Sequence, residues 1–244
     1  MKIPLFDIDG TLFKTGGQLH QDAFNNAFLT IYGVPAKQRD INPEGMTDRQ
    51  VIVEVLKLRG MIPEEIRLKI SEATEYMKRY FDEHKNEAKP KVLPGVKELL
   101  TKLKEEGIPM GVLTGNVEGI AWTKIQTAGL RSFFDFGAFG GQSEVRAELV
   151  EIARINAQKA LDKSFQTQDF VIVGDTPKDI KCARDTGIQV IAVATGIYPF
   201  EELANEKPDL LVHSFGNLER DRVIDFLSGN RRTHERQALQ TEKK

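Results

Sequence analysis

Short apolar segments alternate with longer amphipathic segments over the second half of the 244-residue chain, and this alternation constrains the fold most strongly. Residues 108–113, 170–173 and 189–194 are almost entirely apolar, and the segments between them show the apolar spacing of helices. Strands that are apolar throughout are buried on both faces, as in a parallel sheet covered by helices on both sides. The pattern therefore predicts an α/β fold, with an edge strand at residues 209–213.

A further strand is predicted at the N-terminus, where two carboxylates interrupt an apolar run that begins at Ile3. The side chains of Asp7 and Asp9 point to the same side of an extended chain, because side-chain directions alternate along a strand. Two like charges this close are unfavourable unless a cation or a proton lies between them. Asp9 and Gly10 could instead form a hairpin turn, but the residues that follow offer too short a partner strand. From this stretch alone, a functional site is favoured over the hairpin.

Between the first strand and the rest of the sheet, the apolar spacing is helical and no strand is predicted. We expect an all-helical insert over residues 16–89, with Gly16-Gly17 as a hinge, and an α/β core formed by residues 1–15 and 90–228. The polar segment at residues 229–244 is expected to be disordered. An insert that leaves the sheet after its first strand can lie over the carboxyl ends of the strands, where open α/β sheets bind ligands.

Composition limits the partners that the chain can have. Its 34 Lys and Arg nearly balance its 36 Asp and Glu, so we expect neither nucleic acid nor an anionic membrane as a partner. No segment approaches the ~18 consecutive apolar residues of a membrane span, and the aspartates in the N-terminal apolar run are unlike a signal peptide. Its one cysteine, Cys182, excludes an internal disulfide. We expect a cytoplasmic protein; its oligomeric state is unknown from the sequence.

Polar residues follow three of the predicted strands at their carboxyl ends, where a parallel sheet brings them together. Asp7 and Asp9 follow the first strand, residues 114–116 (Thr-Gly-Asn) follow the second, and Asp175 and Asp179 follow the third. The four carboxylates would form a cluster of hard oxygen ligands of the kind that suits Mg²⁺. The sequence therefore favours a magnesium site at this edge of the sheet.

Groups that could bind phosphate accompany these carboxylates. Thr114 and the amide of Gly115 can donate hydrogen bonds to phosphate oxygens, and Arg146 can supply a positive charge to a transferring phosphoryl group. Simpler interpretations exist for single residues. Asn116 could cap the helix that follows it, and Arg146 could be a surface residue. Phosphate chemistry becomes the better explanation when the groups are taken together.

Asp179 also has a capping interpretation, because Thr176 and Asp179 form a Thr-x-x-Asp pattern around Pro177 at the start of a helix. Capping does not explain Asp175, which lies at the end of a buried strand. Asp175 is therefore the carboxylate of this segment that most clearly indicates a metal.

The motifs FDIDGTL (residues 6–12), LTGN (113–116), a following basic residue and VGDTPKD (173–179) resemble the haloacid dehalogenase (HAD) superfamily. The phosphoglycolate phosphatase-like group, with a helical cap inserted after the first motif, is the most similar type, and the resemblance extends over nearly all of residues 1–225. It implies a Rossmann-like parallel sheet core with an inserted all-helical cap. It also implies a Mg²⁺-dependent phosphatase that acts on a small phosphorylated metabolite through an aspartyl-phosphate.

By this resemblance Asp7 is the nucleophile, Asp9 is the general acid and then the base, and Arg146 replaces the lysine that most members carry. His20 matches a histidine common in capped members, and the loop at residues 45–49 is positioned to dip toward the site. The implied site residues are, as catalytic groups, Asp7, Asp9, Thr114 and Arg146; as phosphate or substrate ligands, Gly10, Gly115, Asn116, His20, Thr47 and Arg49; and as metal ligands, Asp7, Asp9, Asp175 and Asp179.

Alternatives remain for the roles of Thr47 and Arg49 and for the type of reaction. Thr47 could be a helix cap and Arg49 a surface charge. Asp9 argues against dehalogenases and phosphonatases, which lack this second carboxylate. A sugar phosphomutase of the β-phosphoglucomutase type keeps both aspartates and stays open. A non-catalytic binding protein is disfavoured, because the catalytic carboxylates are intact. We expect a phosphatase acting on phosphoglycolate or a sugar phosphate.

Overall fold

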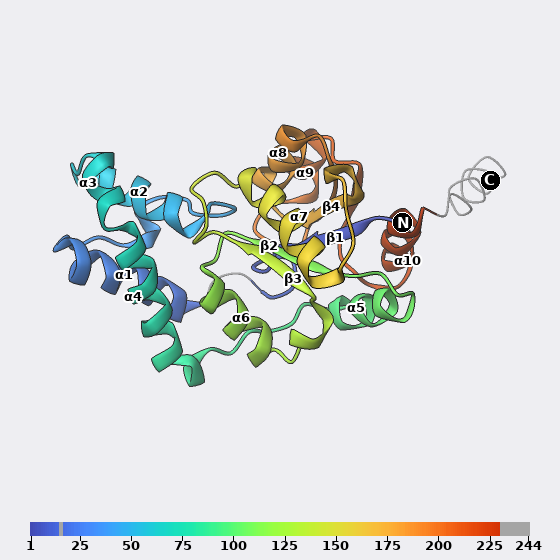
Figure 1. The fold of residues 1–244 in the computed structure, drawn as a ribbon, viewed down its shortest axis with the longest axis horizontal. Coiled ribbons are helices and arrows are strands. Elements are labelled where there is room, and N and C mark those ends of the chain that lie inside the picture. The colour runs from blue at the N-terminus through green and yellow to red at the C-terminus, as the bar shows by residue number, and fades with distance from the viewer. Residues whose placement is uncertain (15–16, 230–244) are drawn as a thin grey trace.

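The computed structural model describes residues 1–14 and 17–229 (Figure 1). Within these residues six parallel strands form one sheet in the order β3-β2-β1-β4-β5-β6. The strands are β1 (Ile3–Phe6), β2 (Gly111–Thr114), β3 (Phe136–Phe139), β4 (Phe170–Gly174), β5 (Gln189–Val193) and β6 (Leu210–Val212). The expected parallel α/β sheet is confirmed, and β6 lies at its edge as expected.

The first strand lies at the centre of the sheet. Leu5 of β1 is aligned with Gly111 of β2 on one side and with Ile172 of β4 on the other, and both pairings are parallel. The hairpin interpretation of Asp9-Gly10 is therefore wrong, because both edges of β1 are already occupied by distant segments. Leu5 and Phe6 are fully buried in separate hydrophobic clusters on opposite faces of the sheet. This explains why the strand is apolar without interruption.

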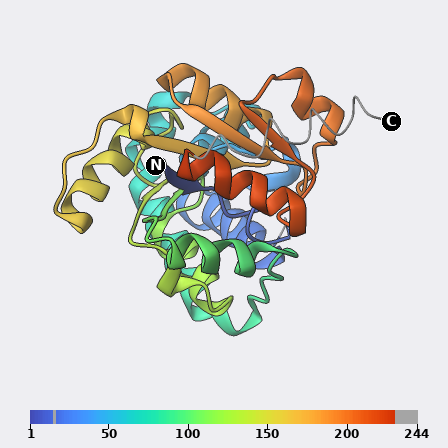
Figure 2. The same cartoon turned by 90° about the vertical axis from the view of Figure 1, so that its right-hand side faces the viewer.

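Helices cover both faces of the sheet (Figures 1 and 2). One face packs against α5 (Val96–Glu105), α6 (Glu118–Thr127) and α10 (Asn217–Ser228). The other face packs against α7 (Glu148–Leu161), α8 (Pro177–Thr186) and α9 (Phe200–Asn205). No helix of the described residues is long and apolar enough to cross a membrane.

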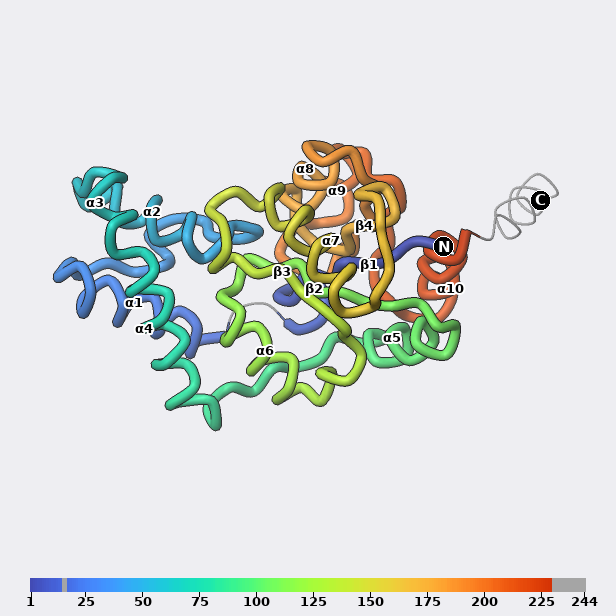
Figure 3. Tube along the Cα trace, in the orientation of Figure 1, coloured from blue at the N-terminus to red at the C-terminus, as the bar shows by residue number. Residues whose placement is uncertain are grey.

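Between β1 and α5 the described residues include four α-helices, which form a separate lobe beside the carboxyl ends of the strands (Figures 1 and 3). They are α1 (Gln18–Tyr32), α2 (Asp48–Leu58), α3 (Pro63–Leu68) and α4 (Ile70–Glu83). Their buried face forms a third hydrophobic cluster, which continues into the core through Val117 and Ile120 at the start of α6. The insert is thus packed onto the core by apolar contacts as well as joined to it covalently.

One helix of the insert differs from the sequence prediction, and two predicted segments lie partly outside the described residues. The apolar spacing after Pro63 continues without a break and predicts one long helix, but the structure divides this segment into α3 and α4 at Lys69, where the backbone leaves the helical conformation (φ −109°, ψ 4°). Of the expected hinge, Gly17 caps α1 and Gly16 lies outside the described residues. The tail expected to be disordered lies outside them from residue 230 onward.

Candidate active site

The carboxyl ends of β1, β2 and β4 lie side by side and face the helical insert across a cavity of about 210 Å³. The cavity has walls from the core and from the loop before α2. Six of the residues that the sequence singled out line it, namely Asp7, Asp9, His20, Gly115, Asn116 and Arg146. Five further polar lining residues, Gln21, Gln38, Arg39, Glu44 and Lys124, were not singled out, and Asp48 lines the cavity as part of the loop at residues 45–49.

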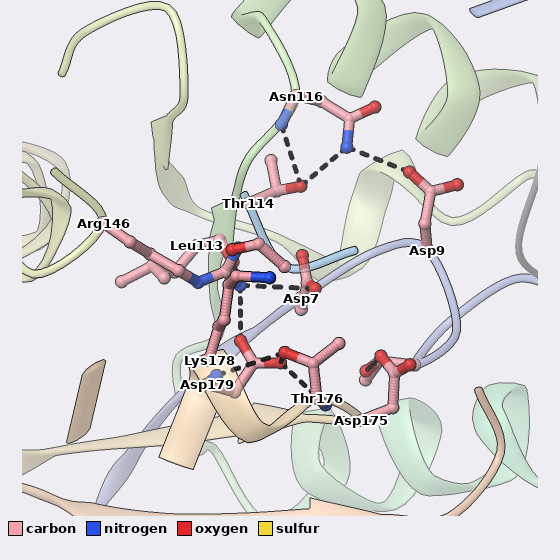
Figure 4. A network of polar contacts seen from close by, with 12 residues as sticks. Asp7, Asp9, Leu113, Thr114, Asn116, Arg146, Asp175, Thr176, Lys178 and Asp179 are labelled. Atoms are coloured by element: carbon pink, nitrogen blue, oxygen red, sulfur yellow. Dashed lines mark hydrogen bonds and ion pairs between the residues drawn. The ribbon is translucent and has the colours of Figure 1, made fainter. Parts of the chain in front are cut away.

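On one side of the cavity, here called the Asp7 side, three buried carboxylates lie together (Figure 4). Asp7 follows β1, Asp175 follows β4 and Asp179 lies in the first turn of α8; one oxygen of each lies within 4.8 Å of the others. Thr176 caps this helix, since its Oγ1 accepts a hydrogen bond from the Asp179 amide at 3.2 Å. In return, Asp179 Oδ2 accepts from the Thr176 amide at 3.1 Å. The expected cap is confirmed, and it fixes Asp179 beside Asp7.

Arg146 is the cation of the Asp7 side. Its Nη2 lies 2.5 Å from Asp179 Oδ1 and 3.3 Å from Asp7 Oδ2 (Figure 4). Burial alone would lower the pKa of Arg146, but Asp179 and Asp7 outweigh this effect and raise it. The guanidinium is therefore charged and held between two carboxylates. The interpretation of Arg146 as a surface residue is wrong, because only 8% of the residue is exposed.

The carboxylates of the Asp7 side repel one another in a buried environment. Burial raises the pKa of Asp7 to about 7, and Asp179 adds to this effect while Arg146 opposes it. Burial also raises the pKa of Asp175, where Asp7 and Asp179 contribute further. Asp175 Oδ1 accepts a hydrogen bond from Thr11 at 2.8 Å, whereas its Oδ2 has no hydrogen-bond partner among the described residues. The site is therefore short of positive charge.

A divalent cation fits this unbalanced site. Gly10 has a φ of +86°, and a Cβ at this position would lie only 2.1 Å from Asp175 Oδ2. Glycine thus permits the left-handed turn and leaves room for the carboxylate. The donors are carboxylate oxygens, which Mg²⁺ prefers. Because Arg146 and Thr176 already engage both oxygens of Asp179, Asp7 and Asp175 are better suited to bind the ion.

On the other side of the cavity, here called the Asp9 side, a buried lysine of α6 holds the second carboxylate. Lys124 Nζ donates to Asp9 Oδ2 at 2.7 Å and to Asn116 Oδ1 at 2.7 Å, and it lies 3.3 Å from His20 Nδ1. Asn116 Nδ2 also donates to Asp9 Oδ2 at 2.9 Å (Figure 4). The three N–H groups of Lys124 thus meet three acceptors. This network holds the carboxylate of Asp9 apart from the three carboxylates of the Asp7 side.

The charges of the Asp9 side favour the ionised form of its carboxyl group. Burial alone would raise the pKa of Asp9, but Lys124 and the hydrogen bonds outweigh burial and hold the pKa below its ordinary value. His20 Nε2 lies 3.1 Å from Asp48 Oδ2, which also accepts from the Val117 amide at 2.8 Å. When Nε2 donates to Asp48, Nδ1 accepts from Lys124. A continuous polar chain therefore links the insert to Asp9.

The loop after β2 supports the Asp9 side. Thr114 Oγ1 accepts from the amide of Asn116 at 3.3 Å and from its Nδ2 at 2.9 Å. The interpretation of Asn116 as a helix cap is wrong, because α6 begins at Glu118 and no side chain caps its first turn. A Cβ at Gly115 would lie 1.9 Å from the carbonyl oxygen of Met46. Glycine is thus needed where the insert approaches the core.

The structure does not bring the side chains of Thr47 and Arg49 to the cavity. Thr47 Oγ1 accepts from the Gln50 amide at 3.2 Å and donates to the Glu144 carbonyl at 3.2 Å. Arg49 Nη1 donates to the Gly141 carbonyl at 3.3 Å. The capping interpretation of Thr47 is confirmed, and both residues join the insert to the core. The interpretation of Arg49 as a simple surface charge is wrong.

Of the residues that hold Asp9, sequence reasoning missed Lys124, and it gave Asp48 of the loop at residues 45–49 no role in the site. A signal was available for Lys124: it follows Ile120 and Ala121 by four and three residues, so it falls on the apolar face of its helix. A lysine on such a face is buried only when its charge is matched. For Asp48 no comparable signal exists, because an acidic residue in the first turn of a helix is explained by the helix dipole.

Comparison with known proteins agrees with this fold. Residues 4–193 match the family model described as haloacid dehalogenase-like hydrolase, so the chain belongs to that family. A protein of Caldanaerobacter subterraneus subsp. tengcongensis, named for the pyrophosphatase PpaX, is 28% identical over 88% of this chain and 91% of its own length. A phosphoglycolate phosphatase of Agrobacterium fabrum is 26% identical over 88% of this chain and 90% of its own length.

Among solved structures, that of CbbY from Rhodobacter sphaeroides in complex with phosphate is similar. It superposes with a TM-score of 0.64 and 23% identity, covering 89% of this chain and 96% of CbbY. The likeness shows the fold, a Rossmann-like parallel sheet with an accompanying set of helices. Family and fold together make this chain an enzyme of the hydrolase class.

Proposed function

We propose that the chain is a Mg²⁺-dependent phosphatase that hydrolyses a small phosphomonoester through an aspartyl-phosphate on Asp7. The observation that carries the proposal is the pairing of two different carboxylates across one cavity. Asp7 lies among acidic groups with one arginine, whereas Asp9 is held by Lys124. The name of one relative, phosphoglycolate phosphatase, agrees with hydrolysis of a phosphate ester, and the name of another, pyrophosphatase, agrees with hydrolysis at phosphorus more generally.

Asp7 is the proposed nucleophile. One of its carboxylate oxygens attacks phosphorus while the bond to the leaving-group oxygen breaks, and this gives the phosphoryl group on Asp7 and a free alcohol. Arg146, 3.3 Å from Asp7 Oδ2, is close enough to neutralise charge on the transferring group. Its ion pair with Asp179 at 2.5 Å keeps the guanidinium in this position. Thr114 and the amides of Gly10 and Gly115 are proposed to position the phosphate.

Asp9 is the proposed general acid and base. It gives a proton to the leaving oxygen in the first step, and in the second it takes a proton from the water that hydrolyses the aspartyl-phosphate. Lys124 and Asn116 both donate to Asp9 Oδ2, so they fix the direction of the carboxyl group. His20 supports Lys124 from the insert. Lys124 is therefore proposed as a positioning residue.

Mg²⁺ would be held by Asp7 and Asp175, together with the main-chain carbonyl of Asp9, and Asp179 would support the site through Arg146. The ion supplies positive charge that neutralises the carboxylates and the phosphate oxygens. The orphaned Oδ2 of Asp175 supports this assignment. Asn116, which the family resemblance groups with the phosphate ligands, donates to Asp9 Oδ2 and would therefore act on the substrate through Asp9.

The size of the cavity supports a small substrate. Its volume of about 210 Å³ is below the ~300 Å³ at which pockets for drug-sized ligands begin. A phosphate ester with a small leaving group is compatible with this space. Thr47 and Arg49, which hold the insert on the core, would act on substrate only indirectly.

The test is phosphate release from a panel of small phosphomonoesters, with and without Mg²⁺, by the wild type and by Asp7→Asn. We expect Mg²⁺-dependent release that the variant lacks. Turnover retained by Asp7→Asn would remove Asp7 as the nucleophile. Glucose 1-phosphate, added as one member of the panel, should give free phosphate; conversion to glucose 6-phosphate would instead identify a mutase.

A further inference from the structure

Glu44 places a carboxylate on the cavity wall that the proposed reaction does not use. It lies in the loop before α2, and its carbonyl oxygen accepts a hydrogen bond from Lys178 Nζ at 2.6 Å, which ties the loop to the core. Glu44 lines the cavity together with Asp9 and Lys124. The structure shows no hydrogen bond or ion pair for the carboxylate of Glu44 within residues 1–14 and 17–229.

The basic groups near Glu44 are already engaged elsewhere. Lys124 is bound to Asp9, Arg146 to carboxylates of the Asp7 side, and Lys178 to the main chain of Glu44 itself. Burial raises the pKa of Glu44 and Asp9 raises it further, while the two lysines oppose this. A half-buried carboxylate without a donor is unfavourable. The residue is therefore in need of a donor, and the cavity is the place from which one can come.

The leaving group of a substrate would occupy this part of the cavity. Asp9 is the proposed acid for the leaving oxygen, and Glu44 is close enough to Asp9 for their charges to interact. Among the other lining residues of the insert, Gln21 and Gln38 are neutral, His20 and Asp48 bind each other, and Arg39 is exposed. The atoms next to the ester oxygen would thus meet a carboxylate.

We propose that Glu44 selects phosphomonoesters whose leaving group carries a hydroxyl or an ammonium group close to the ester oxygen, and rejects those with a carboxylate there. The inference rests on the proposed phosphatase function. A hydroxyl or ammonium would donate a charge-assisted hydrogen bond to Glu44. A carboxylate would instead add a third negative charge beside Glu44 and Asp9. The substrate class is therefore a polyol or amino-alcohol phosphate, and phosphoglycolate is disfavoured.

Three esters of equal length test this inference, because they differ only at the second carbon. They are 2-hydroxyethyl phosphate, phosphoethanolamine and phosphoglycolate, and kcat/KM is measured for each with Mg²⁺ present. We expect the better of the two donor-bearing esters to exceed phosphoglycolate by at least tenfold in the wild type. Whichever of these two is faster identifies the donor as hydroxyl or ammonium.

Glu44→Gln keeps the size of the side chain and removes its charge. We expect this variant to reduce the preference for the donor-bearing ester at least tenfold, partly by raising kcat/KM for phosphoglycolate. The matched control is Glu83→Gln, which removes the same charge from an exposed residue of α4 and should leave the preference unchanged. Thermal unfolding of both variants verifies that they fold.

Two results would overturn the inference: a wild-type preference for phosphoglycolate, or a preference that Glu44→Gln leaves unchanged. A tenfold loss of Mg²⁺ affinity in Glu44→Gln would also overturn it, since Glu44 would then be a metal ligand. Acetyl phosphate separates this inference from the function on which it rests. If the wild type hydrolyses neither acetyl phosphate nor any ester, the phosphatase proposal fails; if it hydrolyses acetyl phosphate but prefers phosphoglycolate, only the inference about Glu44 fails.

Discussion

The Asp7 side and the Asp9 side hold the same kind of group, a carboxyl two residues apart on one chain segment, in opposite electrostatic environments. Burial among other carboxylates raises the pKa of Asp7 to about 7, despite Arg146. Burial acts on Asp9 as well, yet Lys124 and the hydrogen bonds hold its pKa below the ordinary value. Neighbouring charges, rather than residue type or burial, therefore make the difference.

The protein's own groups shift the pKa values of Asp7 and Asp9 in the directions opposite to those that the proposed roles require. A nucleophile should be ionised, but the surroundings of Asp7 favour its neutral form. A general acid should be protonated, but Lys124 favours the ionised form of Asp9. A bound cation would favour ionised Asp7, and a phosphate dianion would favour protonated Asp9. Each side of the cavity thus lacks one charge for its proposed role. The cation would supply it to the Asp7 side and the phosphate dianion to the Asp9 side.

The largest effects are expected when each of the two carboxylates is neutralised in turn. We expect Asp7→Asn to lower kcat by about 10⁵-fold or more, since the nucleophile is lost. Asp9→Asn removes acid–base assistance and should lower kcat by about 10²–10⁴-fold. Steady-state phosphate release measures both. Equal losses in the two variants would contradict the division of roles between the two sides.

The Asp9 side can be tested through the residue that positions it. Lys124→Met removes the ion pair at 2.7 Å and leaves Asp9 without its cation, so we expect kcat to fall by about 10–100-fold. The apparent pKa of Asp9 should rise, which moves the corresponding limb of the pH–rate profile to higher pH. Lys181→Met is the matched control, because Lys181 is exposed and pairs with Asp185 one turn along the same helix. An unmoved pH profile in Lys124→Met would show that the lysine has a structural role only.

The Asp7 side predicts a particular pH dependence of Mg²⁺ binding. Because the pKa of Asp7 is raised to about 7, the group must lose a proton before it can bind the ion at lower pH. Affinity measured by calorimetry should therefore weaken by about tenfold for each pH unit below 7 for every proton released. Above that pH the affinity should level off. In Asp7→Asn this dependence should shrink, and a dependence that persists would assign the proton to another group.

The smallest effect is expected from the residues that hold the two lobes together without facing the cavity. Thr47→Ala removes the cap of α2 and the contact to the Glu144 carbonyl, which should cost about 1 kcal/mol of unfolding free energy. Arg49→Ala should change KM for all substrates in similar proportion, because the side chain binds a core carbonyl. Denaturant unfolding and kinetics on the three two-carbon esters measure these effects. Unequal changes among the esters would restore Arg49 as a substrate ligand.

Much of the architecture could be predicted because it depends on local patterns. Apolar runs such as residues 170–173 specify buried strands, and Thr176 with Pro177 specifies a helix start; both are found. The break at Lys69 could not be predicted, since the apolar spacing continues through it from Ile66 to Ile70. Helix geometry at such a point depends on what each half packs against, and that information is not local.

The candidate site divides in the same way. The carboxylates were identified because like charges at strand ends conflict unless something binds between them, and Asp7, Asp175 and Asp179 do converge. Lys124 was missed because its partner Asp9 is 115 residues away along the chain. The position of Arg146 beside Asp7 likewise depends on tertiary packing, because Arg146 precedes α7 and Asp7 follows β1 in a distant part of the sequence. Motifs could suggest these partners but could not give their distances.

The sequence by itself determined the parallel sheet, the helical insert and the family, because apolar periodicity and closely spaced motifs are local properties of the chain. Only the tertiary structure decided which charge faces which. It assigned Lys124 to Asp9 and Arg146 to Asp7 and Asp179, and it left the carboxylate of Glu44 without a donor among the residues that the structure describes. The physical reason is that electrostatic energies depend on distance and burial, and both are set by the packing of segments that are far apart in the sequence.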